Sequence, residues 1–574
     1  MSEIRNPFEY DQATNLSSQD IIDYYIPDHN YSRFIESTRN VFLVGERGSG
    51  KTMTLMYHSF PIQQQKLKKE KKKVSFEKIG IYIACNTPLF HKKEFELIEQ
   101  NHYKQAVISE HFFVLTIGYY LVDTLSTIRG VLSEKMSALL KTDFEYVLGA
   151  QLPEDKDFFE SVKLFIQKQN RVSQELLNKE DNERFFQTPI SFYSFLIPLI
   201  NFSKKIPSLK KSHFLFLIDD VQDLNLFQIK SLNSWIAFRN HVDFSFKVSF
   251  AKVRDNIFQT ATGGTILEGH DFLMIDLEEP FQNKNSDFYK LATEIIDKRL
   301  KRIGVATKAE DYFPENKKFQ EDLFKIKETL RESFLASNPS ATKKQTDDFL
   351  YKYVRSEYFR SRNDKTNRPT YSGFNTIVAL STGVIRNLLY PCYWAYDKAI
   401  SNSKGKIFKS ISSAIQDDII KEKSAELWAR IENDLANSIE ECSTVQAKEI
   451  SNLFRALAVM FKDRLKQKIS EPRAITFTIS GYTEEYQKEL EPLFRVARKA
   501  QILYTRMGSA KDEGHREKYY VMNRLLLPNY GLDVIGQFSR VSIPARELLA
   551  AAKRGTKIKA QVGNSQTIGD LFNE

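Results

Sequence analysis

Five short apolar runs in the first half of the chain have the length of buried β-strands. They occupy residues 40–44, 79–84, 214–218, 244–251 and 271–277. Continuous apolar runs are typical of strands that helices cover on both faces, as in a parallel sheet; only 244–251 alternates apolar and polar residues. The pattern predicts an α/β fold built on a parallel sheet.

Helical patterns fill the long interval before the third run. Residues 112–140 and 158–177 repeat apolar positions at spacings of three and four, which predicts amphipathic helices. We interpret residues from about 87 to 210 as a helical insertion in the sheet domain. Its aromatic residues are expected to form a core.

The second half of the chain is predicted to be mainly helical at first. A helical lid begins after Pro280, and a polar, mobile insertion runs through 338–340 and 361–370. Residues 401–406 (SNSKGK) are the best candidate for a linker. The last third then reads helix, strand, helix and two strands, at 450–466, 474–479, 484–500, 501–506 and 518–522. This is the order of a winged-helix domain.

The composition fits a folded chain of several domains. Of 574 residues, 42% are hydrophobic and 13% aromatic, which excludes a mainly disordered protein. Three distant cysteines cannot form a disulfide framework, which favours a reducing compartment. The most apolar stretch, 112–122, is too short to span a bilayer and no signal peptide opens the chain. We therefore expect a cytoplasmic protein that has no membrane partner.

The strongest chemical motif is GERGSGKT at residues 45–52, directly after the first apolar run. Its glycines let backbone N–H groups surround phosphate oxygens at a helix N-terminus. Lys51 would reach the β- and γ-phosphates of ATP, and Thr52 would bind Mg²⁺. The alternative is a glycine-rich turn that contains Lys and Thr by chance. The predicted nucleotide-binding residues are Gly45, Gly48, Ser49, Gly50, Lys51, Thr52 and Met53.

Two aspartates follow the third apolar run, where a metal-binding carboxylate belongs. Asp219 is predicted to hold Mg²⁺ and Asp220 to orient or deprotonate the attacking water. Asp220 could instead cap the following helix. Many ATPases with such a loop carry Glu where this chain has the shorter Asp220, which would place the water less well, so we expect slow hydrolysis. After the fourth run, Ser249, Lys252 and Arg254 lie where a γ-phosphate sensor belongs, although each could equally be a solvated surface residue.

These motifs resemble those of AAA+ ATPases, and the closest branch is that of the origin-recognition-complex-like initiators and their bacterial relatives. In that branch a lid helix opens with G-x-x-R, which Gly383–Arg386 matches, so Arg386 is expected to reach the γ-phosphate. The segment 6–8 (NPF) also resembles the branch, in which it packs on adenine. No Arg precedes the last strand, so Arg239 and Arg254 are the only candidates for an arginine finger, and a homo-oligomer remains possible. The DD pair also resembles signalling ATPases that oligomerise on activation.

The resemblance implies four parts: a nucleotide-binding AAA+ domain (1–290), a helical lid (291–402), a winged-helix domain (403–550) and a tail (551–574). The net charge of +10 is concentrated toward the end, where residues 494–554 hold twelve Lys and Arg against five acids. Arg495, Arg498 and Lys499 are expected on one helix surface, with Arg516 and Lys518 near the wing, to contact DNA phosphates. Protein–protein contact is the alternative. The lysines at 66–73 are expected to be a solvated loop.

We therefore expect a Mg²⁺-dependent ATPase that acts on duplex DNA through a winged helix. The resemblance extends to ATPases of bacterial anti-phage loci, which implies a sensor or regulator with an effector on another chain. No HExxH, CxxC or GxSxG motif occurs, so no other catalytic motif is recognised. The alternatives are a nucleotide-gated scaffold that binds no DNA, and a replication initiator of a plasmid or mobile element.

Overall fold

The computed structural model divides into two compact units, Asp11–Leu277 and Met1–Tyr10 together with Glu278–Glu574. Each unit is described by itself. The structure describes residues 6–9, 12–27, 32–85, 102–128, 132–179, 182–187, 189–238, 242–252, 258–277, 286–361, 369–403, 408–467, 469, 471–509, 516–536 and 539–559.

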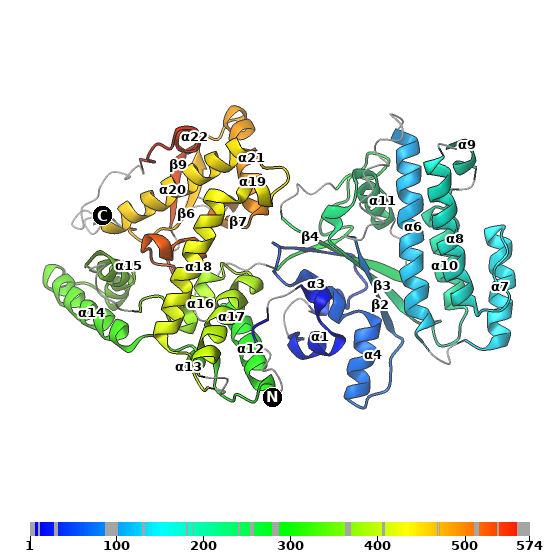
Figure 1. Cartoon of the computed structure of the whole chain (residues 1–574), viewed down its shortest axis with the longest axis horizontal. Coiled ribbons are helices and arrows are strands. Elements are labelled where there is room, and N and C mark those ends of the chain that lie inside the picture. The colour runs from blue at the N-terminus through cyan, green and yellow to red at the C-terminus, as the bar shows by residue number, and fades with distance from the viewer. Residues whose placement is uncertain are drawn as a thin grey trace. The chain divides into compact units, whose positions relative to one another are not determined.

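The first unit is built on a five-stranded parallel sheet in the order β2-β3-β4-β1-β5 (Figure 1). The strands are β1 (Val41–Val44), β2 (Lys78–Ala84), β3 (His213–Asp219), β4 (Phe244–Phe250) and β5 (Leu273–Asp276). All five coincide with the apolar runs of the sequence, so the predicted α/β fold with a parallel sheet is confirmed. Because β4 lies between β1 and β3, residues that follow all three strands meet at one edge.

Both faces of this sheet are buried, which explains the continuous apolar runs. On one face, Leu215 and Leu217 pack with Leu55 of helix α3 (Lys51–Tyr57). On the other, Phe214 and Phe216 join the large core of the helical insertion. Alternate residues of β3 therefore belong to different cores, and neither face can be polar.

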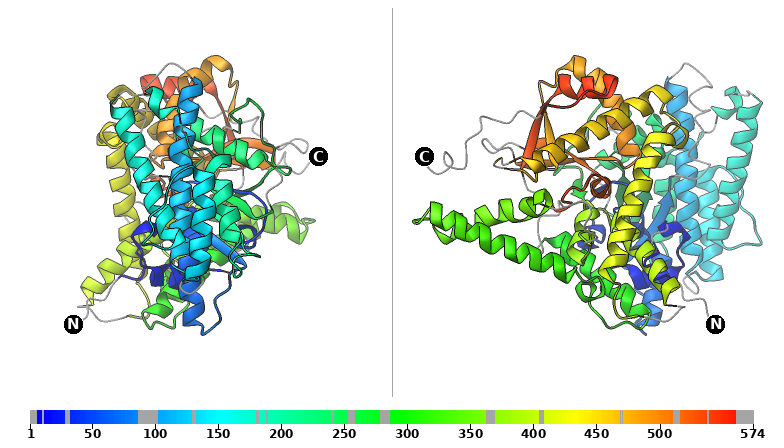
Figure 2. Two further views of the ribbon diagram at one scale, coloured as in Figure 1. Left: turned by 90° about the vertical axis from the view of Figure 1, so that its right-hand side faces the viewer. Right: turned by 60° about the vertical axis from the view of Figure 1, so that its left-hand side comes forward.

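The insertion consists of long helices that pack beside the sheet (Figures 1 and 2). They are α6 (His102–Ser126), α7 (Glu134–Leu148), α8 (Phe158–Asn178) and α10 (Ile197–Lys204). The predicted helical pattern of 112–140 is thus split between α6 and α7. By length and composition α6 could cross a membrane, but 72% of its apolar window is buried inside the protein. It is a core helix of the insertion.

The second unit begins with a helical layer that holds the N-terminal segment. Its helices include α12 (Asp287–Arg302), α13 (Ala309–Tyr312), α16 (Phe374–Leu380), α17 (Ile385–Asn402) and α18 (Ser413–Asn433). Phe8 is fully buried against the rings of Phe313 and Tyr396, with centroids 5.6 and 5.9 Å away. Arg299 of α12 donates hydrogen bonds to the carbonyls of Pro7 and Glu9, both at 2.8 Å. The NPF segment is thus an integral part of this layer.

A helical hairpin lies where a polar insertion was predicted. Helices α14 (Lys317–Ser337) and α15 (Lys343–Ser361) run side by side and extend from the unit (Figure 2). Phe334 stacks on Phe349 with centroids 4.2 Å apart. The predicted polar residues 338–340 form the turn, and 362–368 lie outside the described residues.

The C-terminal part contains a four-stranded sheet in the order β7-β8-β6-β9. Its strands are β6 (Thr476–Ser480), β7 (Leu503–Ser509), β8 (Arg516–Met522) and β9 (Arg540–Pro544), with helices α20 (Thr444–Lys466), α21 (Glu484–Lys499) and α22 (Ala545–Arg554). The predicted helix–strand–helix–hairpin order is present. One helix separates β6 from β7, and β9 adds a strand parallel to β6 that the sequence did not predict. The winged helix stays an interpretation.

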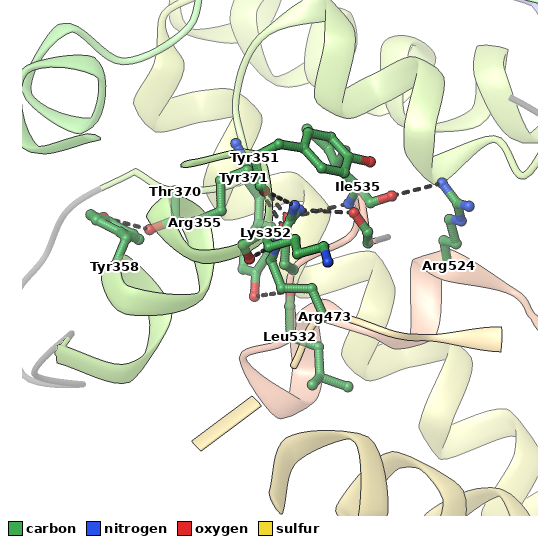
Figure 3. Close-up of polar contacts among 12 residues, drawn as sticks. Tyr351, Lys352, Arg355, Tyr358, Thr370, Tyr371, Arg473, Arg524, Leu532 and Ile535 are labelled. Atoms are coloured by element: carbon green, nitrogen blue, oxygen red, sulfur yellow. Dashed lines mark hydrogen bonds and ion pairs between the residues drawn. The ribbon is translucent and has the colours of Figure 1, made fainter. Parts of the chain in front are cut away.

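A buried ionic cluster joins the helical hairpin to this sheet domain. Asp533, 1% exposed, accepts two hydrogen bonds from Arg355 of α15, at 2.7 and 3.0 Å, and one from Arg473 at 2.9 Å. These guanidinium groups hold the pKa of Asp533 at about 2 despite its complete burial. Figure 3 shows Arg355, Arg473 and Arg524 converging from three segments. Since an unpaired buried charge is costly, the cluster fixes how these segments dock.

Candidate nucleotide-binding site

The GERGSGKT loop connects the end of β1 to the N-terminus of α3. Gly48 and Gly50 have φ angles of 87° and 100°, in the left-handed region that favours glycine. A Cβ atom on Gly45 would lie 2.6 Å from Ser49 Oγ. The backbone N–H of Gly45 also donates to the carbonyl of Phe250 at the end of β4, at 3.3 Å. All three glycines are therefore required by the loop conformation.

Lys51 is folded back over the loop. Its ammonium group donates to the carbonyls of Gly45 and Glu46 at 2.8 and 3.0 Å, and the residue is only 5% exposed. Ser49, also 5% exposed, has a buried hydroxyl oxygen that finds no hydrogen-bond partner among the described residues. A buried ammonium, an unpartnered hydroxyl and a helix N-terminus at one loop are the groups that a phosphate chain would satisfy.

Asp219 ends β3 and is 1% exposed. Tyr82 of β2 donates to its Oδ2 at 2.9 Å and Ser249 of β4 donates to its Oδ1. The hydroxyl of Thr52 lies near enough to lower the pKa of the carboxylate. Burial, and secondarily the charge of Asp220, raises its pKa despite these hydroxyl groups. Within the described residues no Lys or Arg forms an ion pair with it. The two predicted Mg²⁺ ligands, Thr52 and Asp219, therefore lie near each other.

Asp220 has a backbone conformation that is uncommon for a non-glycine residue, with φ 57° and ψ 45°. Its N–H donates to Ser249 Oγ at 3.0 Å, and Gln222 Nε2 donates to its Oδ1 at 2.9 Å. The alternative role, as cap of the following helix α11 (Leu226–Ala237), is wrong. Asn225 caps that helix, in a capping box with Gln228.

The predicted sensor residues have different environments. Ser249 contacts both aspartates, whereas Lys252 forms an ion pair with Asp276 at 2.6 Å. Arg239 and Arg254, the arginine-finger candidates, lie outside the described residues. Tyr82 was missed by the sequence reasoning. The signal that could have found it is a polar-tipped aromatic residue near the end of a strand that neighbours β3.

In the other unit, Arg386 lies in the first turn of α17. The turn before this helix contains Thr382, whose φ of 55° is strained for a β-branched residue. Arg506 of β7 donates to the Thr382 carbonyl at 3.2 Å, and Asn387 Nδ2 donates to the hydroxyl of Tyr504 at 2.8 Å. The start of the G-x-x-R helix is thus held by the β7 strand.

The basic residues of α21 do not form the predicted common surface. Arg498 is 8% exposed and forms an ion pair with Glu491 at 2.5 Å. Lys499 forms an ion pair with Glu441 at 2.5 Å, and Arg495 is exposed. The expectation that all three face a DNA backbone is therefore wrong, because the helix turns Arg498 toward the protein interior. Lys518 on β8 is exposed, and the side chain of Arg516 is outside the described residues.

Residues 6–543 match the family model of ORC-CDC6-like proteins. The chain belongs to the ORC-CDC6-like family. No curated protein sequence matches it. Among solved structures it is similar to the ORC2 protein of Aeropyrum pernix, determined as ADPNP and ADP complexes, with 10% identity and a TM-score of 0.31 over 96% of this chain and 97% of that one. ORC-CDC6-like proteins are AAA+ ATPases.

Proposed function

We propose that this ORC-CDC6-like protein binds ATP with Mg²⁺ at the GERGSGKT loop and hydrolyses it slowly. The observation that carries the proposal is the buried carboxylate of Asp219 at the end of β3, which the hydroxyls of Tyr82 and Ser249 hold in place with Thr52 nearby. The unpartnered hydroxyl of Ser49 and the folded-back ammonium of Lys51 support a phosphate ligand.

Mg²⁺ fits the donor set, because hydroxyl and carboxylate oxygens are its preferred protein ligands. Thr52 and Asp219 would hold it, with Ser249 and Tyr82 fixing the carboxylate orientation. When bound, the metal neutralises charge that develops on the phosphates. Lys51 would leave the carbonyls of Gly45 and Glu46 to bind the β- and γ-phosphates, and Met53 would line the site.

Asp220 is the proposed base that orients water, and Arg386 the proposed contact of the γ-phosphate from the lid. Asp220 Oδ1 is already engaged by Gln222. Together with the short Asp side chain, this supports slow turnover. Arg386 would then couple the nucleotide state to α17 and, through Asn387 and Tyr504, to β7.

We further propose that the C-terminal domain contacts duplex DNA. Its support is the family's link with nucleic acid and the exposed Arg495, Lys518 and Arg546. The second candidate is a nucleotide-gated protein scaffold without DNA binding. The internal ion pairs of Arg498 and Lys499 favour it, because they remove two predicted phosphate contacts from solvent.

The defence role is a narrower proposal, in which this ATPase senses phage and an effector on a separate chain acts. Replication initiation of a mobile element is its competitor. Expression of the full locus followed by phage plaque counts tests it. Protection that is lost with Lys51→Ala supports defence. Unchanged plaque counts, together with defective plasmid maintenance in Lys51→Ala, support the initiator.

Lys51→Ala also tests the nucleotide site itself. We expect ATP affinity to fall at least about tenfold and phosphate release to fall to background, because a charge-assisted phosphate contact is lost. Lys317→Ala, at an exposed lysine on α14, is the matched control. ATP titration and phosphate release with Mg²⁺, and again with EDTA, supply the readouts. Equal behaviour of the two variants contradicts the site.

A further inference from the structure

Two lysine-rich segments meet at the edge of the parallel sheet opposite the GERGSGKT loop. The first, 66–78, connects α4 (Phe60–Lys69) to β2, and the second, 204–211, connects α10 to β3. Together they hold eleven lysines and only two acidic residues: Lys66, Lys68, Lys69, Lys71, Lys72, Lys73, Lys78, Lys204, Lys205, Lys210, Lys211, Glu70 and Glu77.

Hydrogen bonds show that the two segments are neighbours. Ser212 Oγ donates to the carbonyl of Phe76 at 2.5 Å, and the N–H of His213 donates to the carbonyl of Glu77 at 2.8 Å. Lys78 and His213 are register partners at the start of β2 and β3. Since the strands are parallel and the phosphate loop follows the end of β1, these starts lie at the other edge of the sheet.

Several of the lysines have structural partners. Lys69 pairs with Asp23, Lys72 with Glu70, and Lys205 with Asp143. Lys204 pairs with Asp243, and Lys66 lies over the ring of Tyr57. The end of α4 further favours cations in its last turn. Intramolecular contacts thus explain these five positions.

The other six have no such explanation. Within the part of the chain that the structure describes, they are exposed and their ammonium groups form neither an ion pair nor a hydrogen bond: Lys68, Lys71, Lys73, Lys78, Lys210 and Lys211. We call these six residues the far-edge lysine surface. They lie on two segments that are joined at Phe76–Glu77 and Ser212–His213, and like charges on neighbouring segments repel each other, which an anionic partner relieves.

The side chains beside the far-edge lysine surface indicate which kind of anion it binds. A membrane-binding surface presents exposed apolar side chains for insertion beside its charges. None of the large exposed hydrophobic residues falls within 66–78 or 204–211. A lysine ammonium acts as a point charge, which suits a phosphate backbone and provides no base readout.

We propose that the far-edge lysine surface binds the phosphate backbone of duplex nucleic acid, without sequence preference. It belongs to the first unit and is separate from the proposed DNA contacts of the C-terminal domain. It requires neither nucleotide nor Arg386. The nucleotide proposal and this one can therefore fail independently.

The test reverses four exposed lysines, in the variant Lys71→Glu, Lys73→Glu, Lys210→Glu, Lys211→Glu. The matched control reverses four exposed lysines of the α14–α15 hairpin, at 317, 318, 343 and 344, with the same change of net charge. Fluorescence anisotropy of a labelled duplex DNA is measured over a NaCl series with the full chain. Thermal unfolding checks that both variants fold.

We expect the far-edge variant to lose about tenfold or more in affinity at low salt. The slope of log K against log [salt] should become shallower by roughly 3 to 4, and the control should keep the wild-type slope. Equal losses in both variants would show an effect of net charge alone and overturn the proposal. Wild-type protein that binds vesicles rich in phosphatidylserine but no DNA would overturn it in favour of a membrane.

Discussion

Asp219 and Asp533 are both aspartates with 1% exposure, yet their surroundings are opposite. Two guanidinium groups surround Asp533, and its pKa is lowered to about 2. Among the described residues, Asp219 is contacted by the hydroxyls of Ser249 and Tyr82, with Thr52 nearby, and its pKa is raised. Two guanidinium groups thus compensate the charge of Asp533, whereas no Lys or Arg of the described part of the chain forms an ion pair with Asp219.

The difference is that between a carboxylate whose charge is compensated by guanidinium groups and one whose charge is not compensated within the described residues. A buried carboxyl of the second kind favours its neutral form, and a cation that binds beside it makes ionisation less costly. Asp533 then contributes to stability in every state of the protein. Under the proposed function, the ionised Asp219 would lower stability until Mg²⁺ and nucleotide bind, so that ligand binding and stability would depend on the same residue.

The largest expected effect is on stability, in Asp533→Asn. Neutralising this carboxylate leaves Arg355 and Arg473 buried without a counter-charge, and should cost about 3–5 kcal/mol of unfolding free energy. Asp219→Asn should cost less than about 1 kcal/mol without ligand, because no cation loses its partner. Urea unfolding of both variants measures this, with Asp463→Asn, at an exposed position, as control. Equal destabilisation by the two buried substitutions would contradict the comparison.

The next effect is on ligand-dependent stability. At a ligand concentration of one hundred times Kd, Mg²⁺ with a non-hydrolysable ATP analogue should stabilise the wild type by about 2.7 kcal/mol. Asp219→Asn should lose most of this gain, since the metal loses its carboxylate. Thermal unfolding of the wild type with and without ligand measures the gain. A full gain in Asp219→Asn would place the metal elsewhere.

The two carboxylates also predict opposite dependence on pH. The folded pKa of Asp533, about 2, lies below its unfolded value. Its contribution is therefore present above about pH 4 and is lost as pH falls through about 2. The stability gap between wild type and Asp533→Asn should shrink by about 2.5 kcal/mol over that window. The raised pKa of Asp219 predicts the opposite sign: the free energy of unfolding should fall as pH rises and the Asp219 carboxyl ionises.

How much of these two sites could be predicted depends on how far apart their residues are in the sequence. The loop and Asp219 were predictable because each motif is contiguous and follows an apolar strand. The partner of Asp219 on β2 is 137 residues away, and Arg355 and Asp533 are separated by 178 residues. No local pattern joins such pairs, since only the folded sheet and the docked hairpin bring them together.

Burial of charged residues was equally hidden in the sequence. Arg498 and Lys73 carry the same charge in basic segments, yet one lies inside the protein and the other in solvent. The count of charges therefore predicted a basic surface on α21. In the structure, Arg498 and Lys499 of that helix form ion pairs within the protein, and only Arg495 forms no such pair among the described residues. The fold class was predictable because apolar runs report burial directly. Strand β9 was not, because its five residues include an arginine and a proline.

The smallest expected effect tests how Asp219 is held in place. Tyr82→Phe removes one hydroxyl donor but keeps the ring, so the unfolding free energy should change by no more than about 1 kcal/mol. The Mg²⁺ concentration required for half-maximal phosphate release should rise by roughly fivefold, because the carboxylate loses one of its orienting contacts. Tyr289→Phe, on α12 of the other unit, removes a comparable tyrosine-to-carboxylate hydrogen bond, to Glu310, and is the control. A lower turnover with an unchanged Mg²⁺ requirement would mean that Tyr82 acts on the fold and not on the metal ligand.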